Sequence, residues 1–247
     1  MSQDVAAPRG IRRAITGMIG AQVLIGIALI GMDLMQSLPA RDLLTMPTPA
    51  GPSTRPYAPD RVQVTSPDGM PSTAPMPERL EFSGDAEVLT LTGQIAEGDG
   101  ARFAAELGLR AQTGQAITSI ALDSTGGSVS DALEIGEAIR AAGLTTQMQG
   151  AAVCLSACPY ILAGGTERQV PPTAKVGVHQ HYFGESGILP AFMAVEDVQR
   201  GQAEVMSYLI RMGISPEVMA LAMRTPPDQI YLLSRDELQE FGFIPAE

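Results

Sequence analysis

One serine of the chain lies where a nucleophile could be activated. Ser156 stands midway between Cys154 and Cys158, the only two cysteines, in the segment GAAVCLSACPYILAGG. Because proline is tolerated in the first turn of a helix but not deep inside it, Pro159 predicts a helix that begins near Ser156 to Cys158. The serine hydroxyl would then lie at the positive end of a helix, where the N–H of Ala157 could hold an oxyanion. A serine that only caps the helix is the alternative interpretation.

The only two histidines of the chain, His179 and His181, lie together in the segment VGVHQHYF. If this segment is a strand, the two side chains project from the same face. Histidine is the usual base for activating a serine, because its pKa is close to the working pH. The pair could also ligate a metal, but no nearby Cys, His or Asp has the spacing of a third ligand, so no metal is expected. Two solvated histidines at a strand end are the remaining interpretation.

A glycine turn is the third candidate segment. In ALDSTGGSVSDALEIG an apolar run leads into two glycines and then into a helix that Ser128 or Ser130 could cap. Such a turn leaves backbone N–H groups at a helix N-terminus, where they can receive negative charge. Glycine also lets a ligand approach the backbone closely. A Gly-Gly turn that merely permits a bend is the alternative.

Strand-like and helix-like segments alternate from about residue 80 onward, and these elements must position the three candidate segments. The residue patterns predict strands at 86–95, 117–124, 144–153 and 174–183. They predict helices at 101–112, 128–143, 156–165, 189–213 and 215–223. This alternation predicts one layered α/β domain with mostly parallel strand pairing.

The composition restricts the class of partner. The formal net charge is -11, and Lys and Arg are not clustered in the way that phosphate binding requires. Nucleic acid is therefore not an expected partner.

The N-terminus has the pattern of an uncleaved signal anchor. Three arginines precede an uncharged run over 14–32, which as a helix would be roughly 28 Å long, close to the apolar core of a bilayer. The charge bias predicts a cytoplasmic N-terminus over 1–13, a transmembrane anchor over 14–36 and export of everything that follows. For a bacterial protein, this places a single-pass protein in the inner membrane with its C-terminal domain in the periplasm. A cleaved leader is the alternative.

A proline-rich segment separates the expected anchor from the domain. Residues 37–80 hold more than half of the nineteen prolines and show no apolar periodicity. Such a segment cannot bury enough apolar surface to fold, so it is expected to be a semi-extended linker. The folded domain is expected over 81–247.

Several of these motifs, in this order, resemble those of the ClpP-like serine peptidases. The resemblance covers the segments GGSV, AAVCLSACPYILAGG, TERQVPPTAKV, VHQ and LLSRDELQEFGFI. It is strongest for a membrane-tethered or periplasmic group of that family. It implies a ClpP/crotonase-like fold of stacked βαβ units and, by analogy with other proteins of this fold, self-association into homo-oligomers.

The resemblance also implies roles for individual residues. Ser156 matches the nucleophile, His179 the general base, and the N–H groups of Gly127 and Ala157 the oxyanion hole. The family's third triad member is an Asp, but this chain has prolines near that position, and Asp228 is the nearest carboxylate. His181 falls outside the family's motif.

The cysteine pair departs from the family pattern. In an oxidising compartment Cys154 and Cys158 could form a disulfide, because Cys154 precedes the expected helix and can adjust its geometry. Such a bond would fix the backbone on both sides of Ser156. Two buried thiols are the alternative.

Together these features predict an exported serine hydrolase, most simply a peptidase, that acts on peptides or proteins and needs no cofactor. A pseudoenzyme that keeps the fold for binding or assembly is the main alternative. An acyl-CoA enzyme of the crotonase type is disfavoured by export, because coenzyme A is cytoplasmic.

Overall fold

The computed structural model describes residues 9–37, 63–64, 76–181 and 191–246. The chain divides into two compact units, the first of which contains helix α1, Arg9–Ser37. This helix includes the segment 14–36, and the apolar side chains of Leu24 and Ile30 are exposed. Within the described ranges, no helix combines the length and the apolar content of a membrane span. The expected transmembrane anchor is therefore not supported.

The second unit is built on a mixed sheet. Its strands are β1 (Gln63–Val64), β2 (Glu81–Gly84), β3 (Val88–Ile95), β4 (Ser119–Gly127), β5 (Thr145–Gln147), β6 (Val153–Leu155), β7 (Arg168–Gln169), β8 (Lys175–Val178) and β9 (Gln229–Leu232). They are ordered β1-β9-β8-β6-β4-β3-β2, and β5 pairs with β4 and β7. The central pairs β3–β4, β4–β6 and β6–β8 are parallel, whereas β2–β3 and β8–β9 are antiparallel.

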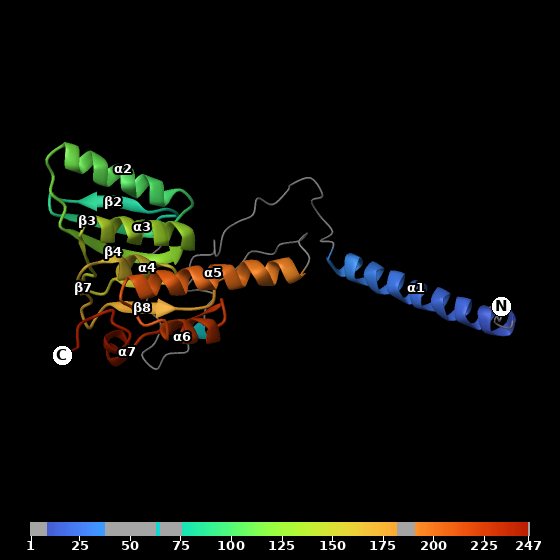
Figure 1. Ribbon diagram of the computed structural model, residues 1–247. Coiled ribbons are helices and arrows are strands. Elements are labelled where there is room, and N and C mark those ends of the chain that lie inside the picture. Colours follow the sequence, from blue (N-terminus) through green and yellow to red (C-terminus); the bar gives the residue numbers. More distant parts are fainter. Residues whose placement is uncertain (1–8, 38–62, 65–75, 182–190, 247) are drawn as a thin grey trace, which may run out of the picture. The chain divides into compact units, whose positions relative to one another are not determined.

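Six helices of the described residues accompany the sheet. They are α2 (Asp99–Gln112), α3 (Val129–Ala141), α4 (Cys158–Gly164), α5 (Ala191–Arg211), α6 (Val218–Arg224) and α7 (Arg235–Glu240). Helix α2 joins β3 to β4, and α3 packs against both α2 and α4 (Figure 1). Strand β3 buries alternate residues, and β4 is buried on both faces, so β4 lies at the centre of the core. The α/β class and the βαβ connections are confirmed.

Helices α3 and α4 cross at two glycines. A Cβ atom on Gly164 would lie 2.4 Å from the backbone oxygen of Gly136 and 2.6 Å from its Cα. A side chain at residue 164 would therefore force the helices apart. The crossing holds α4, and with it the turn before α4, close to α3.

Two predicted strands differ from the structure. Residues 144–153 form two short strands, because the left-handed Gly150 interrupts them and β5 and β6 pair with different parts of β4. The strand predicted over 174–183 ends at Val178, so His179 and His181 follow the strand rather than alternate along it.

The predicted linker over 37–80 lies largely outside the described residues. Within it, Gln63 and Val64 form β1 and pair with β9, which the sequence did not predict. Leu80 is fully buried, and the carbonyl of Pro77 accepts a 2.9 Å hydrogen bond from the N–H of Gln94. The ordered domain thus begins a few residues before 81.

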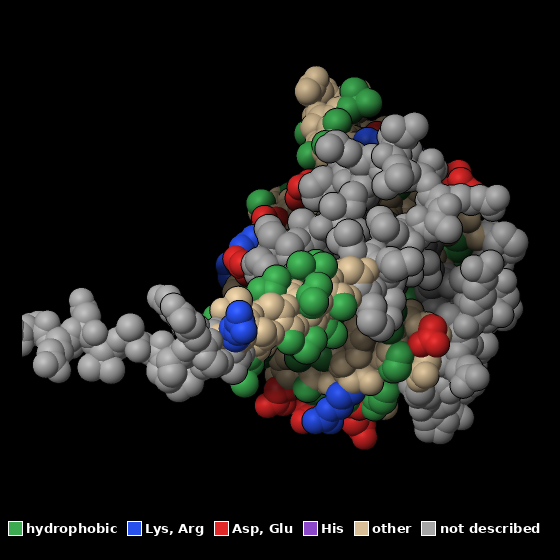
Figure 2. Space-filling model, turned by 90° about the vertical axis from the view of Figure 1, so that its right-hand side faces the viewer, with side chains coloured by type: hydrophobic (Ala, Val, Ile, Leu, Met, Phe, Trp, Pro, Cys, Tyr) green, Lys and Arg blue, Asp and Glu red, His purple; other side chains and the backbone are tan. Residues whose placement is uncertain are grey.

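On the face shown in Figure 2, the described basic side chains lie singly and mostly beside acidic ones. Elsewhere in the domain, Arg211 pairs with Glu137, and their charged atoms are 2.6 Å apart.

Candidate active site

Ser156 lies in a tight turn between β6 and α4. Its φ angle is +62°, and among the described residues it is the only one other than glycine with a positive φ. Its N–H donates a 2.9 Å hydrogen bond to the carbonyl of Gly177 in β8, which holds the turn in place. A left-handed serine costs free energy, and such strain is concentrated at functional sites. The N-cap of α4 is Ala157, so the interpretation of Ser156 as a simple helix cap is wrong.

The structure brings Ser156 and His179 together. The Oγ atom of Ser156 and the Nε2 atom of His179 are 2.7 Å apart. The parallel pairing of β6 with β8 explains this contact, because Ser156 and His179 follow these strands at the same edge of the sheet. The two residues are only 8% and 6% exposed, so their hydrogen bond lies in a largely dry environment.

The electrostatics of the site keep His179 neutral. Burial lowers the pKa of His179 to about 4. A neutral imidazole with its proton on Nδ1 can accept the serine proton at Nε2. However, Nδ1 is buried and has no hydrogen-bond partner in the described part of the chain. Among the described residues, no carboxylate orients this histidine as in a complete triad.

Asp228 does not supply that carboxylate. It is exposed in the turn before β9 and makes no hydrogen bond to His179. The register of β8 and β9 ends at Val178, which pairs with Tyr231. Beyond it the N–H of Gln180 donates to the carbonyl of Thr225, so the chain leaves the strand pairing at the histidine.

The glycine turn at the end of β4 packs against the serine turn. A Cβ atom on Gly126 would lie 2.5 Å from the Cβ of Ser156 and 2.9 Å from the amide nitrogen of Ala157. The N–H of Gly126 donates to the Oγ of Ser124 at 3.1 Å. Gly127 is the next residue, and a Cβ on it would meet the carbonyl of Ile95 in β3. Gly126 was not among the predicted site residues, although its place in the same motif was a usable signal.

The N–H of Ala157 is suited to receive negative charge. This residue precedes α4, and its amide makes no hydrogen bond to any part of the chain that the structure describes. An unpaired amide at a helix N-terminus, next to the serine, has the position of an oxyanion-hole donor.

We predict that Gly126→Ala slows the reaction of Ser156 with a fluorophosphonate probe by about a hundredfold, because a methyl group there must displace the serine. Gly114→Ala is the matched control, since Gly114 has a comparable left-handed φ of +75° but no atoms within 4 Å of a Cβ. Labelling rates of the two variants are compared at equal folded fractions. Equal slowing in both would show that backbone strain, and not contact with the serine, is responsible.

The two cysteines are bonded to each other. Cys154 lies in β6 and Cys158 is the first residue of α4, with their Cα atoms 5.1 Å apart. Both are fully buried, and the bond encloses Ser156 and Ala157. The predicted disulfide is confirmed, and it joins the strand to the helix directly across the serine turn.

We predict that the double variant Cys154→Ala/Cys158→Ala is less stable by about 2 kcal/mol, the value expected for closing so short a loop. The same variant should label more slowly, because the serine turn loses its cross-link. Urea unfolding and probe kinetics measure the two effects. An unchanged labelling rate would contradict the idea that the bond fixes the turn.

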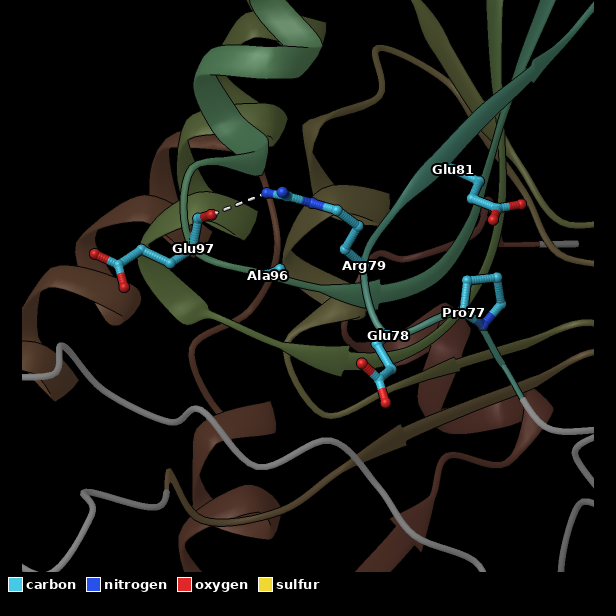
Figure 3. A pocket seen from close by; sticks show the side chains of 6 residues that line it. All are labelled: Pro77, Glu78, Arg79, Glu81, Ala96 and Glu97. Atoms are coloured by element: carbon cyan, nitrogen blue, oxygen red, sulfur yellow. Dashed lines mark hydrogen bonds between the residues drawn. The ribbon is translucent and has the colours of Figure 1, made fainter.

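A cavity of about 210 Å³ adjoins the glycine turn. It is lined by Glu78, Gln94, Ile95, Ala96, Glu97, Gly127 and Ser128. A second hollow of about 680 Å³ shares Glu78, Ala96 and Glu97 with it. Figure 3 shows Arg79 reaching across this second hollow to the backbone carbonyl of Glu97, at 3.1 Å. Arg79 also pairs with Asp99 at 3.0 Å, so the loop after β3 is fixed from two sides.

No metal site accompanies these residues: in the ranges that the structure covers, no three or more His, Cys, Asp or Glu side chains are grouped to bind one.

The strained serine, its buried histidine and the glycine turn lie together in an α/β domain of the ClpP type. The family model of Clp proteases matches residues 84–244, so the chain belongs to this family. Among solved structures, the chain is similar to a point mutant of ClpP1 from Listeria monocytogenes, with 18% identity and a TM-score of 0.48. That match covers 64% of this chain and 89% of the other. No curated protein matches the chain.

Proposed function

We propose that the domain is a serine hydrolase that cleaves peptides, with Ser156 as nucleophile and His179 as general base. The observation that carries this proposal is the 2.7 Å contact between Ser156 Oγ and His179 Nε2, made by a serine in a strained left-handed turn. Membership of the Clp protease family supports the peptide as the substrate class.

The proposed reaction has two halves. Ser156 Oγ attacks the peptide carbonyl carbon while its proton passes to His179 Nε2, and the oxyanion is held by the N–H groups of Ala157 and Gly127. The C–N bond then breaks, and His179 gives the proton to the departing amine. A water molecule next loses a proton to His179 and attacks the acyl-serine, which releases the acid product and restores the serine.

The unpartnered Nδ1 of His179 limits this chemistry. A base works best when its pKa is near the working pH, and no carboxylate raises the pKa of this one. We therefore propose a slow enzyme rather than an inactive one, because loss of the triad acid costs far less than loss of serine or histidine. The same observation favours a second candidate, a binding or assembly module that no longer catalyses.

A fluorophosphonate probe distinguishes the two candidates. The purified protein is incubated with the probe, and the modified peptide is identified by mass spectrometry. Phosphonylation of Ser156 and slow hydrolysis of peptide mixtures support the hydrolase. If the folded protein stays unlabelled and cleaves no peptide, the binding or assembly module is the candidate function that remains.

The pH dependence of labelling follows from the buried histidine. Because the reaction needs neutral His179, and its pKa is lowered to about 4, the rate should rise with pH through about 4 and be level from about 6 to 8. Above the pKa the Nε2 atom is free to accept a proton, and below it Nε2 is already protonated. Circular dichroism at each pH confirms that the protein is folded. An inflection near 6.5, the value of an ordinary histidine, would contradict the argument.

We propose that the domain acts as a homo-oligomer, since proteins of the ClpP type typically assemble and act on peptides. Light scattering coupled to size-exclusion chromatography measures the assembly. A monomer at all concentrations would oppose it.

We also propose that the domain works in the bacterial periplasm. A disulfide between the only two cysteines and the arginines before the apolar run at 14–32 support this compartment. An alkaline phosphatase reporter joined after Arg79 should be active, and activity only in a cytoplasmic reporter would overturn the proposal.

A further inference from the structure

A second hydroxyl–histidine contact lies beside the proposed catalytic pair. The Oη atom of Tyr160 and the Nε2 atom of His181 are 2.7 Å apart, and the rings meet edge to face with centroids 5.9 Å apart. Tyr160 is four residues after Ser156, and His181 is two residues after His179. The same two segments are thus joined twice, once through the reacting groups and once through Tyr160 and His181.

The surroundings keep both partners of this hydrogen bond neutral. Burial raises the pKa of Tyr160, so its hydroxyl stays protonated. Burial, and then repulsion from the protonated form of His179, lowers the pKa of His181 to about 4. Near neutral pH the contact therefore joins a neutral phenol to a neutral imidazole, in which the donor depends on the tautomer of His181.

The tyrosine itself is held firmly. Its side chain is 3% exposed, and its hydroxyl lies 3.9 Å from the sulfur of Met219. Its backbone carbonyl accepts a 2.7 Å hydrogen bond from the hydroxyl of Tyr208 in α5. The ring of Tyr160 is therefore a rigid anchor on α4.

The chain segment that follows His179 has two anchors. The N–H of Gln180 donates to the carbonyl of Thr225 at 2.9 Å, and its side-chain amide donates to the carbonyl of Met223 at 2.7 Å. His181 is bound to Tyr160. The Nδ1 atom of His179 has no hydrogen-bond partner among the described residues. The position of the imidazole therefore depends on the backbone that these contacts fix.

We propose that Tyr160 and His181 are positioning residues, which hold His179 against Ser156 in place of a carboxylate, which none of the described residues supplies. This inference rests on the proposed hydrolase function. The Tyr160–His181 bond ties the segment carrying the base to the helix that follows the nucleophile. A base held in this way keeps its reactive geometry without an acid at Nδ1.

The test compares Tyr160→Phe with Tyr208→Phe in the full chain. Each removes one buried tyrosine hydroxyl, but only the first breaks the bond to His181. We expect Tyr160→Phe to lower kcat for peptide hydrolysis, and the maximal rate of fluorophosphonate labelling, by about tenfold at unchanged KM. Tyr208→Phe keeps the Tyr160–His181 bond, so it should lose stability but lower kcat clearly less than Tyr160→Phe does.

Substitutions of His181 complete the design. His181→Ala should match Tyr160→Phe, and the double variant should be no slower, because both remove the same bond. His181→Gln should recover most of the rate, since its amide oxygen can accept from the tyrosine. Equal kcat in wild type and Tyr160→Phe would overturn the positioning role while leaving the hydrolase intact.

Nitrogen-15 spectra of the two histidines give a readout that does not depend on turnover. The Nε2 signal of His181 should show a hydrogen-bonded nitrogen near pH 7, and that signal should shift in Tyr160→Phe. An Nε2 signal of His181 that is the same in wild type and Tyr160→Phe would overturn the inference. Absence of Ser156 labelling in a wild type with the expected spectra would instead count against the hydrolase.

Discussion

Replacing Asp228 by asparagine is expected to leave the labelling of Ser156 unchanged, whereas Ser156→Ala and His179→Ala each reduce peptide hydrolysis by about a hundredfold, because the described part of the site already lacks the contribution of a triad acid. Asp228 is exposed and does not contact the histidine, so its charge does not orient the base. Ser156 and His179 share one hydrogen bond, so the loss of either side chain removes the serine–histidine pair. Peptide hydrolysis and active-site labelling of the three folded variants measure the contrast.

Removing both Ser156 and His179 should cost no more than removing one, since the two groups act as a unit. Circular dichroism and urea unfolding verify that each variant is folded. A large loss of activity in Asp228→Asn would show that the carboxylate reaches His179 during catalysis, and would restore a triad in place of the pair.

Gly164→Ala is expected to destabilise the domain by about 3 kcal/mol. The added Cβ would lie 2.4 Å from the backbone oxygen of Gly136, and backbone atoms inside a helix cannot move aside as a flexible side chain can. Helix α4 would have to separate from α3. The free energy of unfolding in urea measures the loss.

Gly108→Ala is the matched control for the helix crossing. Gly108 is an exposed glycine within α2, and a Cβ there would have no atom within 4 Å. The alanine should stabilise the helix by about 0.5 to 1 kcal/mol, because it restricts the unfolded chain. If both alanines stabilised the domain, the close crossing of α3 and α4 would be wrong.

The proximity of Ser156 and His179 could be predicted from the sequence, because parallel strands place their carboxyl ends at one edge of the sheet. The residues that follow β6 and β8 therefore lie close together and do not depend on the loop conformations for their proximity. The helix that begins at Cys158 followed from the position of Pro159. The left-handed conformation of Ser156 did not follow, because a serine shows no sequence signal for a positive φ.

The third triad member was not predictable by counting along the chain. Which side chains reach His179 depends on where β8 ends and on the conformation of the turn before β9, and in that turn Asp228 is exposed. The contact of Tyr160 with His181 depends on tertiary packing in the same way. Sequence periodicity marked Tyr160 only as an apolar helix residue, although a buried hydroxyl must find a partner.

The predictions for the N-terminal part had less structural support. The segment 14–36 is helical as expected, but a membrane span is not supported within the described residues. Most of the segment 37–80 lies outside the residues that the structure describes, and β1 shows that local composition did not determine all of it. The short strand β1 forms by pairing with β9. The composition of a segment alone does not predict such a pairing.

The cystine that spans Ser156 also provides a way to measure how often the serine turn opens. Both sulfur atoms are shielded from solvent, so a phosphine reductant can attack only after the strand end and the first turn of α4 separate. The rate at which the reductant cleaves the disulfide therefore depends on how often the serine turn opens.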